Sequence, residues 1–353
     1  MEGFKVIKSG IFDTIQDLGR FGFQRYGMPV GGAMDSYALR IGNRLLGNKE
    51  NEAGIEISSP GLSLEVLSRT VIGITGADFN PTINNLPAPI WEALEVKKGD
   101  NISFNQIKSG CRSYLLVAGG IDVPNMLGSK STYTRGKIGG LKGRPLSKYD
   151  LINIGNPNQK LPDIIGRKVP SINIPNYHEE NKIRVMLGPQ DDYFTKNGLY
   201  AFLNSFYEIT VHSDRMGYRL KGPKIKSKNG SDIITDGVPL GSIQVPQDGM
   251  PIVMLADRQT TGGYAKIATV ISVDIDKLAQ MKPGNKIKFT PINLEEAHRL
   301  LGEREKNITD LQFKKKETIE SKSGNARIFK VKIEEKIYKV EIKEILIRKE
   351  NNV

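Results

Sequence analysis

The chain has 353 residues, a formal net charge of +12 at pH 7 and a single cysteine, Cys111. This length exceeds what one hydrophobic core usually serves, so we expect two domains. The lone cysteine excludes a disulfide within the chain and a cysteine-based metal site, and it is typical of a cytoplasmic protein. The basic residues are dispersed and no nucleic-acid-binding motif accompanies them, so the charge indicates a solvated basic surface rather than a nucleic-acid partner.

The first half of the chain predicts one helix among several short strands. Asp35–Leu46 has a capping residue at its start and apolar residues at helical spacing. The strand-length apolar runs are Leu62–Val66, Val71–Ile74 and Tyr114–Val117, each lying between turn signals. No apolar run approaches the roughly 20 residues that a bilayer-spanning helix needs, so we expect no membrane segment.

After a change in composition, the second half again predicts short strands and a few helices. Residues 155–182 contain many Asn, Pro and Lys residues and indicate a linker. Ile183–Leu187 predicts a strand, Leu199–Ser205 a short helix, and Asn293–Leu301 a longer helix. Gly302 is the expected stop of that longer helix.

The residues after Gly302 differ from both halves. A Lys- and Glu-rich stretch precedes 327–342, where apolar and polar residues largely alternate, and this alternation predicts a β-hairpin. We therefore expect a mainly β protein with a few short helices. The predicted domains are 1–180, 181–302 and a tail over 303–353.

Four stretches combine glycine, amide and charged residues more densely than a scaffold requires. They are Thr14–Asp35, Gly119–Thr132, Ser213–Arg219 and Gly241–Tyr264. In the last of these, polar residues and then two glycines follow a predicted buried strand, an arrangement that suits a ligand-binding loop. An Asp–Arg pair that braces a tight turn is an equally good interpretation from chemistry alone.

Several sequence blocks resemble one protein family, in the same order and over about residues 4–300. That family holds the C subunit of 5-oxoprolinase, the biotin-dependent carboxyltransferase domain of urea amidolyase, allophanate hydrolase subunit 2 and KipA, an antagonist of a sporulation-kinase inhibitor. The blocks that carry the resemblance are Gln16–Arg20, Gly32–Asp35, Asn43, Gly47–Asn48, Tyr114–Asp122, Gly128–Thr132, Gly139–Arg144, Arg215–Leu220, Gly241–Pro246 and Asp257–Tyr264.

The resemblance implies a pair of cyclophilin-like β-barrel domains with a ligand between them, beside the predicted hairpin tail. It also implies a subunit of a multi-subunit enzyme that acts on a small cyclic amide or urea-like substrate. The first choice is the C subunit of 5-oxoprolinase, an enzyme in which ATP-dependent opening of 5-oxoproline to glutamate requires A- and B-type partner subunits. The alternatives are a carboxyltransferase that moves carboxylate from carboxybiotin to urea, and a non-enzymatic regulator that binds a KipI-like kinase inhibitor.

Missing motifs limit what this chain carries by itself. It has no P-loop and no nucleophile elbow of the Gly-x-Ser-x-Gly type, and its histidines lack metal-ligand spacing. The Ala-Met-Lys-Met context of a biotinylated lysine is also absent. We therefore expect no metal and no covalently bound cofactor, with carboxybiotin carried by a partner or ATP handled by partner subunits.

Carboxyl transfer and lactam opening both develop negative charge on a carbonyl oxygen. Both reactions therefore need groups that bind an anion and groups that stabilise an oxyanion. The predicted catalytic residues are Gln244, Asp257 and Arg258, and alanine at Gln244 or Arg258 is expected to abolish activity in a folded protein. For Asp35 and Asn43, helix capping or local backbone bonding is an equally good interpretation. The predicted substrate-binding residues are Asp35, Asn43, Arg215, Ser242, Gln259, Thr260, Gly262 and Gly263.

Overall fold

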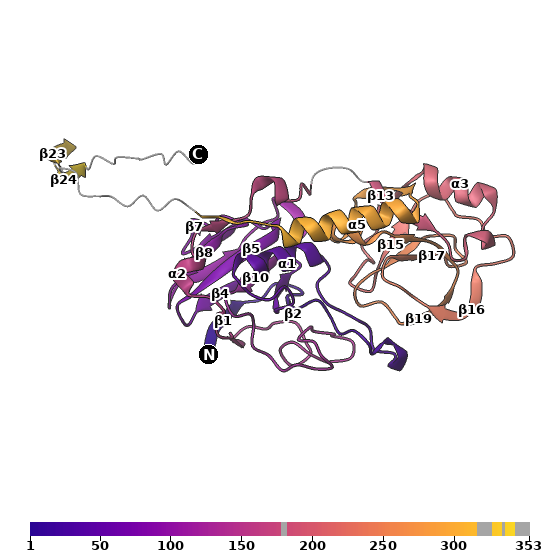
Figure 1. The fold of residues 1–353 in the computed structure, drawn as a ribbon, viewed down its shortest axis with the longest axis horizontal. Coiled ribbons are helices and arrows are strands. Elements are labelled where there is room, and N and C mark those ends of the chain that lie inside the picture. Colours follow the sequence, from indigo (N-terminus) through magenta and orange to yellow (C-terminus); the bar gives the residue numbers. More distant parts are fainter. Residues whose placement is uncertain (178–181, 316–326, 334–335, 343–353) are drawn as a thin grey trace. The chain divides into compact units, whose positions relative to one another are not determined.

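The computed structural model describes residues 1–177, 182–315, 327–333 and 336–342. The chain divides into one compact unit, Met1–Lys314, and a second, Lys315–Val353. Most described elements are short strands, as the sequence predicted (Figure 1). None of the described helices is long and apolar enough to cross a membrane.

The N-terminal half of the first unit is built from two antiparallel sheets. A six-stranded sheet has the order β11-β1-β4-β9-β6-β7, and a five-stranded sheet has the order β2-β3-β10-β5-β8. Their bounds are β1 (Glu2–Lys8), β2 (Thr14–Gln16), β3 (Gly54–Ile57), β4 (Ser63–Val66), β5 (Thr70–Asp78), β6 (Pro81–Ile83), β7 (Leu86–Pro87), β8 (Ala93–Val96), β9 (Asn101–Phe104), β10 (Ser109–Val117) and β11 (Leu151–Asn153).

Strand β5 is buried along almost its whole length because both of its faces are covered. Ile72 and Ile74 pack into the core between the two sheets, whereas Val71 packs on the other side with residues of helix α1 (Ser36–Leu45). This alternation follows from the two-residue period of a strand. Helix α1 begins where predicted, because the Asp35 carboxylate accepts a hydrogen bond of 2.9 Å from the Ala38 amide.

The C-terminal half closes into a barrel with the strand order β13-β20-β17-β18-β15-β14-β21. A separate two-stranded ribbon, β16 with β19, lies beside it. Phe202 and Phe289 stack in the barrel core with ring centroids 4.6 Å apart. The bounds are β13 (Lys182–Leu187), β14 (Phe206–Ile209), β15 (Gly217–Lys221), β16 (Asp232–Gly237), β17 (Ser242–Gln244), β18 (Ile252–Met254), β19 (Thr261–Tyr264), β20 (Lys266–Val270) and β21 (Lys286–Pro291).

The remaining elements differ in part from the sequence prediction. Helix α5 does not end at Gly302 but continues to Thr309, so that predicted stop is wrong. Helix α4 was not predicted, and residues 155–177, interpreted as linker, hold short elements of their own. The bounds are α2 (Leu161–Ile164), α3 (Lys196–Asn204), α4 (Ser272–Ala279), α5 (Leu294–Thr309), β12 (Arg167–Lys168), β22 (Lys314–Lys315), and the 3-10 turns η1 (Gln24–Tyr26), η2 (Ser171–Asn173) and η3 (Asp191–Tyr193).

The second unit contains the predicted hairpin. Strand β23 (Arg327–Ile333) pairs antiparallel with β24 (Lys336–Ile342), and Val331 lies opposite Tyr338. The two residues between the strands lie outside the described part of the chain.

Candidate functional site

The loop over residues 18–34 leaves the N-terminal half and lies against the barrel (Figure 1). The amide of Gly31 donates a hydrogen bond of 3.1 Å to the carbonyl oxygen of Ala256, which follows strand β18. The next carbonyl in the loop, that of Gly32, accepts a hydrogen bond of 2.6 Å from Arg215 of the barrel half. The loop is therefore attached to the barrel by its backbone.

Two adjoining cavities form where this loop meets the barrel, and we call them together the cleft. The first, of 420 Å³, is here named the apolar chamber, and the second, of 670 Å³, the polar chamber. Gln24, Leu240 and Arg258 line both. The apolar chamber is further lined mainly by Leu18, Phe21, Val30, Ala33, Met34, Leu255 and Ile275, with Ser36, Arg40 and Glu50 also present. The polar chamber is further lined by Asp236, Ser242, Thr260, Thr261, Lys266 and Thr269.

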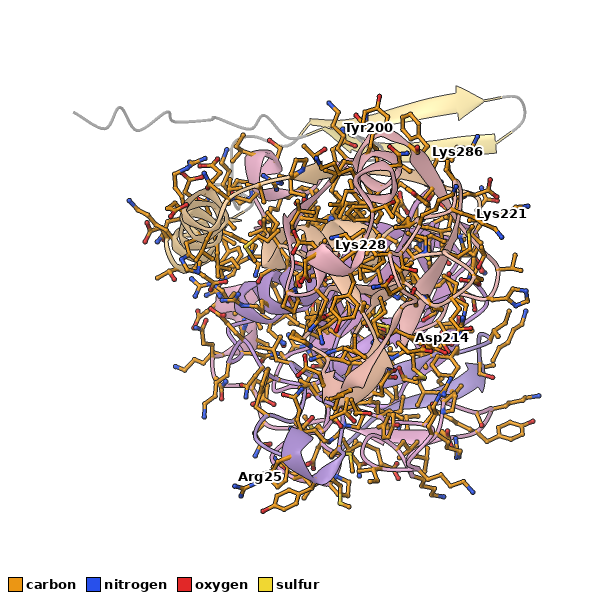
Figure 2. All side chains as sticks on the ribbon, turned by 90° about the vertical axis from the view of Figure 1, so that its right-hand side faces the viewer. Arg25, Tyr200, Asp214, Lys221, Lys228 and Lys286 are labelled. Atoms are coloured by element: carbon orange, nitrogen blue, oxygen red, sulfur yellow. The ribbon has the colours of Figure 1, made fainter. Side chains whose placement is uncertain are left out.

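The rim of the cleft includes the projecting turn η1. Arg25 lines the polar chamber, and its guanidinium lies 4.7 Å from the centre of the Tyr26 ring. Figure 2 shows Arg25 at the edge of the molecule, far from Tyr200 on α3, with its side chain directed outward. The exposed Arg25 therefore contributes a solvated charge at the entrance rather than a fixed group inside.

Arg258 is the predicted residue that the structure places at the junction of the two chambers. Its side chain is only 6% exposed, and it donates to the carbonyl oxygens of Val238, at 2.8 Å, and Leu255, at 3.3 Å. In the described part of the chain it forms no ion pair with a carboxylate. Burial lowers the pKa of Arg258 to about 10, because removal from water disfavours the charged form.

Two further polar side chains of the barrel line the polar chamber. Ser242 is fully buried, and its hydroxyl has no hydrogen-bond partner among the described residues. Lys266 is 1% exposed, and its ammonium group donates to the carboxylate of Asp236 at 2.6 Å. Asp236 belongs to the exposed strand β16, so a buried cation is paired here with a solvent-exposed anion.

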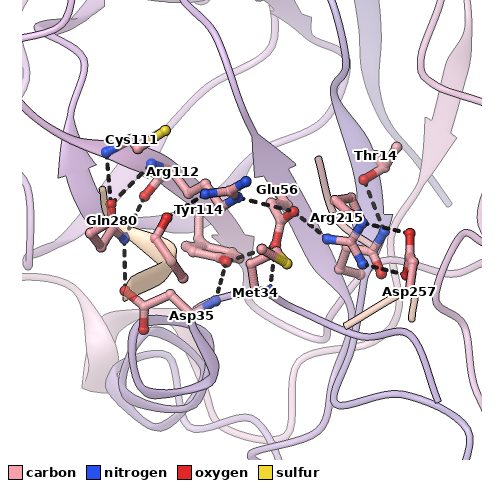
Figure 3. Close-up of polar contacts among 12 residues, drawn as sticks. Thr14, Met34, Asp35, Glu56, Cys111, Arg112, Tyr114, Arg215, Asp257 and Gln280 are labelled. Carbon is pink, nitrogen blue, oxygen red and sulfur yellow. Dashed lines mark hydrogen bonds and ion pairs between the residues drawn. The ribbon is translucent and has the colours of Figure 1, made fainter. Parts of the chain in front are cut away.

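Asp257 and Arg215 lie beneath the cleft and form a bidentate ion pair. Arg215 donates to the two oxygens of Asp257 at 2.9 and 3.0 Å. The same guanidinium donates to Glu56 of strand β3, so it lies between two buried carboxylates from different halves (Figure 3). The Asp–Arg pair that braces this turn is therefore Asp257 with Arg215, and not Asp257 with its neighbour Arg258.

Glu56 connects this ion pair to the helix that follows the loop. Its other oxygen accepts from the Met34 amide at 2.8 Å and from the Tyr114 hydroxyl at 2.7 Å, and the Asp35 amide donates to that hydroxyl at 2.8 Å (Figure 3). Burial alone would raise the pKa of Glu56, but the positive charges of Arg215 and Arg112 hold it below its ordinary value. Glu56 is therefore a buried anion that is fully paired.

Gln244 and Gln259 brace strand β19 at one side of the site. The Gln244 amide donates to the Tyr264 carbonyl at 3.2 Å and accepts from Gln259 at 3.2 Å. A Cβ atom at Gly262 would lie only 2.6 Å from the Gln244 amide nitrogen, so a larger residue at this position would displace the Gln244 side chain. Thr260 lines the polar chamber, whereas Gly263 is partly exposed on β19.

Asp35 and Asn43 are not among the residues that line the cleft. Asp35 caps α1 and lines a different cavity, of 360 Å³, together with Tyr177 and Asp276. Burial, and then repulsion from Asp276, raises the pKa of Asp35 to about 7. Asn43 is fully buried and donates to the carbonyl oxygens of residues 50 and 52, so it holds the local backbone. For both residues the structure favours the local role that the sequence left open.

Sequence reasoning missed Glu56 and Lys266. Each is a charged residue between apolar neighbours in a buried strand, in Ile55-Glu56-Ile57 and in Ala265-Lys266-Ile267. A charge at such a position requires a partner, and this was the available signal. The described residues contain no group of three or more His, Cys, Asp or Glu side chains that could hold a metal ion.

Comparison with known proteins agrees with this architecture. A family model for the carboxyltransferase domain, subdomains A and B, matches residues 26–291. The 5-oxoprolinase C subunit of Haemophilus influenzae is 37% identical over 287 residues, which span 81% of this chain and 90% of that protein. The Escherichia coli protein of the same name is 38% identical over 293 residues, which span 83% of this chain and 92% of its own length.

The fold of this chain is also similar to that of a solved structure. The crystal structure of the K. lactis urea amidolyase superimposes with a TM-score of 0.83 at 32% sequence identity, and the match covers 88% of this chain but only 20% of the larger one. These relatives are enzymes or components of enzymes. Residues 26–291 include Ser242, Arg258 and Lys266 of the cleft, whereas Gln24 lies before the matched region. The chain belongs to the carboxyltransferase-domain family, subdomains A and B.

Proposed function

We propose that this chain is the C subunit of a 5-oxoprolinase, which opens the lactam ring of 5-oxoproline to glutamate at the expense of ATP. The proposal is supported by two relatives that carry the name of this 5-oxoprolinase component and are matched over 90% and 92% of their lengths. The larger amidolyase is matched over only 20% of its chain. We further propose a cytoplasmic location, A- and B-type partner subunits, and ATP handling by those partners.

The single observation that carries this proposal is the position of Arg258. It lies at the junction of two chambers, in a cleft made by the loop over 18–34 and the barrel. Opening a lactam places negative charge on the carbonyl oxygen. A fixed donor in a water-poor site stabilises such charge far better than water does, because the donor needs no reorientation. Arg258 is placed to supply that stabilisation.

The other residues of the site hold Arg258 and its surroundings in position. Both oxygens of Asp257 accept hydrogen bonds from Arg215, so Asp257 fixes the segment that carries Arg258 rather than taking a proton from the substrate. Gln244 and Gln259 hold strand β19 beside the polar chamber. In this account Gln244, Asp257 and Arg215 are positioning residues, and Arg258 is the group that contacts the substrate.

A carboxyltransferase is the second candidate, and the structural match to urea amidolyase favours it. Carboxybiotin, carried by a partner, would supply an activated carboxyl group in that reaction. The buried Arg258 and the unpartnered hydroxyl of Ser242 suit the recognition of such a carboxylate. The cleft chemistry is thus compatible with either reaction, and the named relatives favour the first.

The test is purification of the chain with its partner subunits from the native cell, followed by two assays. We expect ATP hydrolysis that depends on 5-oxoproline, with glutamate formed in equal amount. Carboxylation of urea by carboxybiotin, without any response to 5-oxoproline, would instead establish the carboxyltransferase.

A further inference from the structure

Three buried hydrogen-bond donors of the barrel line the polar chamber. Ser242, Arg258 and Lys266 are at most 6% exposed, and they come from strand β17, from the segment after β18 and from strand β20. Ser242 has no hydrogen-bond partner among the described residues, and Arg258 has only carbonyl partners. Of these three donors, only Lys266 therefore has a carboxylate partner among the described residues.

This imbalance is costly in a folded protein unless a ligand corrects it. A buried hydroxyl without a partner loses its hydrogen bonds to water and gains none in return. A buried guanidinium usually pairs with an anion, and here burial lowers the pKa of Arg258 because no anion compensates. A planar anion with two oxygens can accept from both groups at once, and charge-assisted hydrogen bonds of this kind are the strong ones.

The partner of Lys266 indicates that the ligand is negatively charged. Its ammonium group is already neutralised by a carboxylate, that of Asp236, which reaches the chamber from the exposed strand β16. Asp236 also accepts a hydrogen bond of 3.4 Å from Gln190 at the surface. A side-chain carboxylate thus occupies one donor of the chamber, whereas Arg258 has only carbonyl acceptors and Ser242 has no acceptor among the described residues.

We propose that the polar chamber is a carboxylate subsite, in which Ser242 and Arg258 bind the carboxylate of the small cyclic substrate, while Arg258, which lines both chambers, also donates to the carbonyl oxygen of the ring. The apolar chamber, beyond Arg258, then receives the remainder of the reacting molecule. This inference rests on the proposed function only for the identity of the substrate, since the donors themselves are independent of it.

The experiment is calorimetric titration of the full chain with two ligands. The first is 5-oxoproline, and the second is 2-pyrrolidinone, which has the same lactam ring and no carboxylate. We expect 5-oxoproline to bind at least tenfold more tightly. Ser242→Ala should weaken 5-oxoproline binding about threefold to tenfold without changing the binding of 2-pyrrolidinone. Arg258→Gln loses contacts with both the carboxylate and the ring carbonyl, so it should weaken 5-oxoproline binding roughly tenfold to a hundredfold.

Two further variants separate this subsite from a general effect of charge or folding. Asp236→Asn leaves Lys266 without its anionic partner and should tighten 5-oxoproline binding severalfold, a gain that damage to the fold would not produce. Arg219→Gln removes an exposed cation of the same half and should leave affinity unchanged. Thermal unfolding of each variant reports whether it is folded.

The outcomes distinguish the subsite from the proposed function. Equal affinity for the two ligands, no binding of either, or unchanged affinity in folded Arg258→Gln would overturn the subsite. If the expected binding is found but the complex with its partners shows no hydrolysis of ATP that depends on 5-oxoproline, then the subsite stands and the proposed function is wrong.

Discussion

Arg215 of the C-terminal half donates a hydrogen bond to the carboxylate of Glu56, on strand β3 of the N-terminal half. Both side chains are buried, and 159 residues separate them in the sequence. Because the same guanidinium also binds Asp257 and the carbonyl of Gly32, a single cation joins the two halves and the loop that lines the cleft.

Replacing Glu56 by Gln should therefore destabilise the protein strongly. Removing one member of a buried ion pair leaves an uncompensated charge and costs about 3–5 kcal/mol in typical cases. Urea unfolding measures the loss directly. The control is Arg69→Ala, which breaks a solvent-exposed pair with Glu95 and should cost no more than about 1 kcal/mol. Similar losses in the two variants would show that Arg215 and Glu56 contribute little.

Replacing Ser242 by Ala should have the opposite effect on stability. Its hydroxyl is buried without a partner, so its removal is expected to raise the free energy of unfolding by about 1 kcal/mol while weakening substrate binding. Ser131→Ala is the matched control, because that buried hydroxyl accepts a 3.0 Å hydrogen bond from the Asp17 amide and its loss should destabilise. A destabilised Ser242→Ala would mean that the hydroxyl has a partner within the folded chain.

Replacing Arg258 by Ala should lower kcat/KM of the assembled enzyme by about a hundredfold to a thousandfold, the usual effect of losing an oxyanion donor. Replacing Gln244 by Ala should have a smaller effect, about tenfold, because Gln244 acts by holding β19 in place. Steady-state kinetics with 5-oxoproline gives both values, and Arg219→Ala serves as the control. Full activity in folded Arg258→Ala would exclude that residue from catalysis.

The pH dependence of stability should reveal Asp35. Its pKa is about 7 in the folded state against an ordinary value of 3.8, so the folded state binds the proton more tightly than the unfolded state. Between about pH 4 and pH 7 the folded state therefore holds more protons, and the free energy of unfolding falls as the pH rises through this window.

Replacing Asp35 by Asn should flatten that slope, because Asn can still cap the helix but cannot ionise. Urea unfolding at pH 4.5, 6 and 7.5 measures the slope in both proteins. Burial also raises the pKa of Asp13 to about 6, so part of the slope is expected to remain. An identical slope in Asp35→Asn would show that Asp35 does not titrate in this range.

The sequence predicted those elements whose signals are local. Helix α1 follows from the Asp35 cap and the spacing of Ala38, Ile41 and Leu45, all within a few turns. Helix α4 was missed because Ile271 precedes it and offers no side-chain cap. Helix α5 passes Gly302 because an internal glycine costs only about 1 kcal/mol, which the packing of Ile308 offsets.

For the site, sequence blocks identified the residues near the cleft but not what each one contacts. Arg258 and Ser242 were predicted and line the polar chamber. Glu56 and Lys266 were missed because their partners come from distant segments, and no local pattern specifies such pairs. For the same reason, the sequence did not show which arginine lacks a carboxylate partner. The structure shows that Arg215 is neutralised by two carboxylates, whereas Arg258 has none among the described residues.

The most direct test of the central claim is a crystal structure of the assembled enzyme soaked with 5-oxoproline. We expect electron density for the ligand in the cleft, with its carboxylate within hydrogen-bond distance of Arg258 and Ser242. Ligand density found only in the cavity beside Asp35, or only on one of the partner proteins, would contradict it.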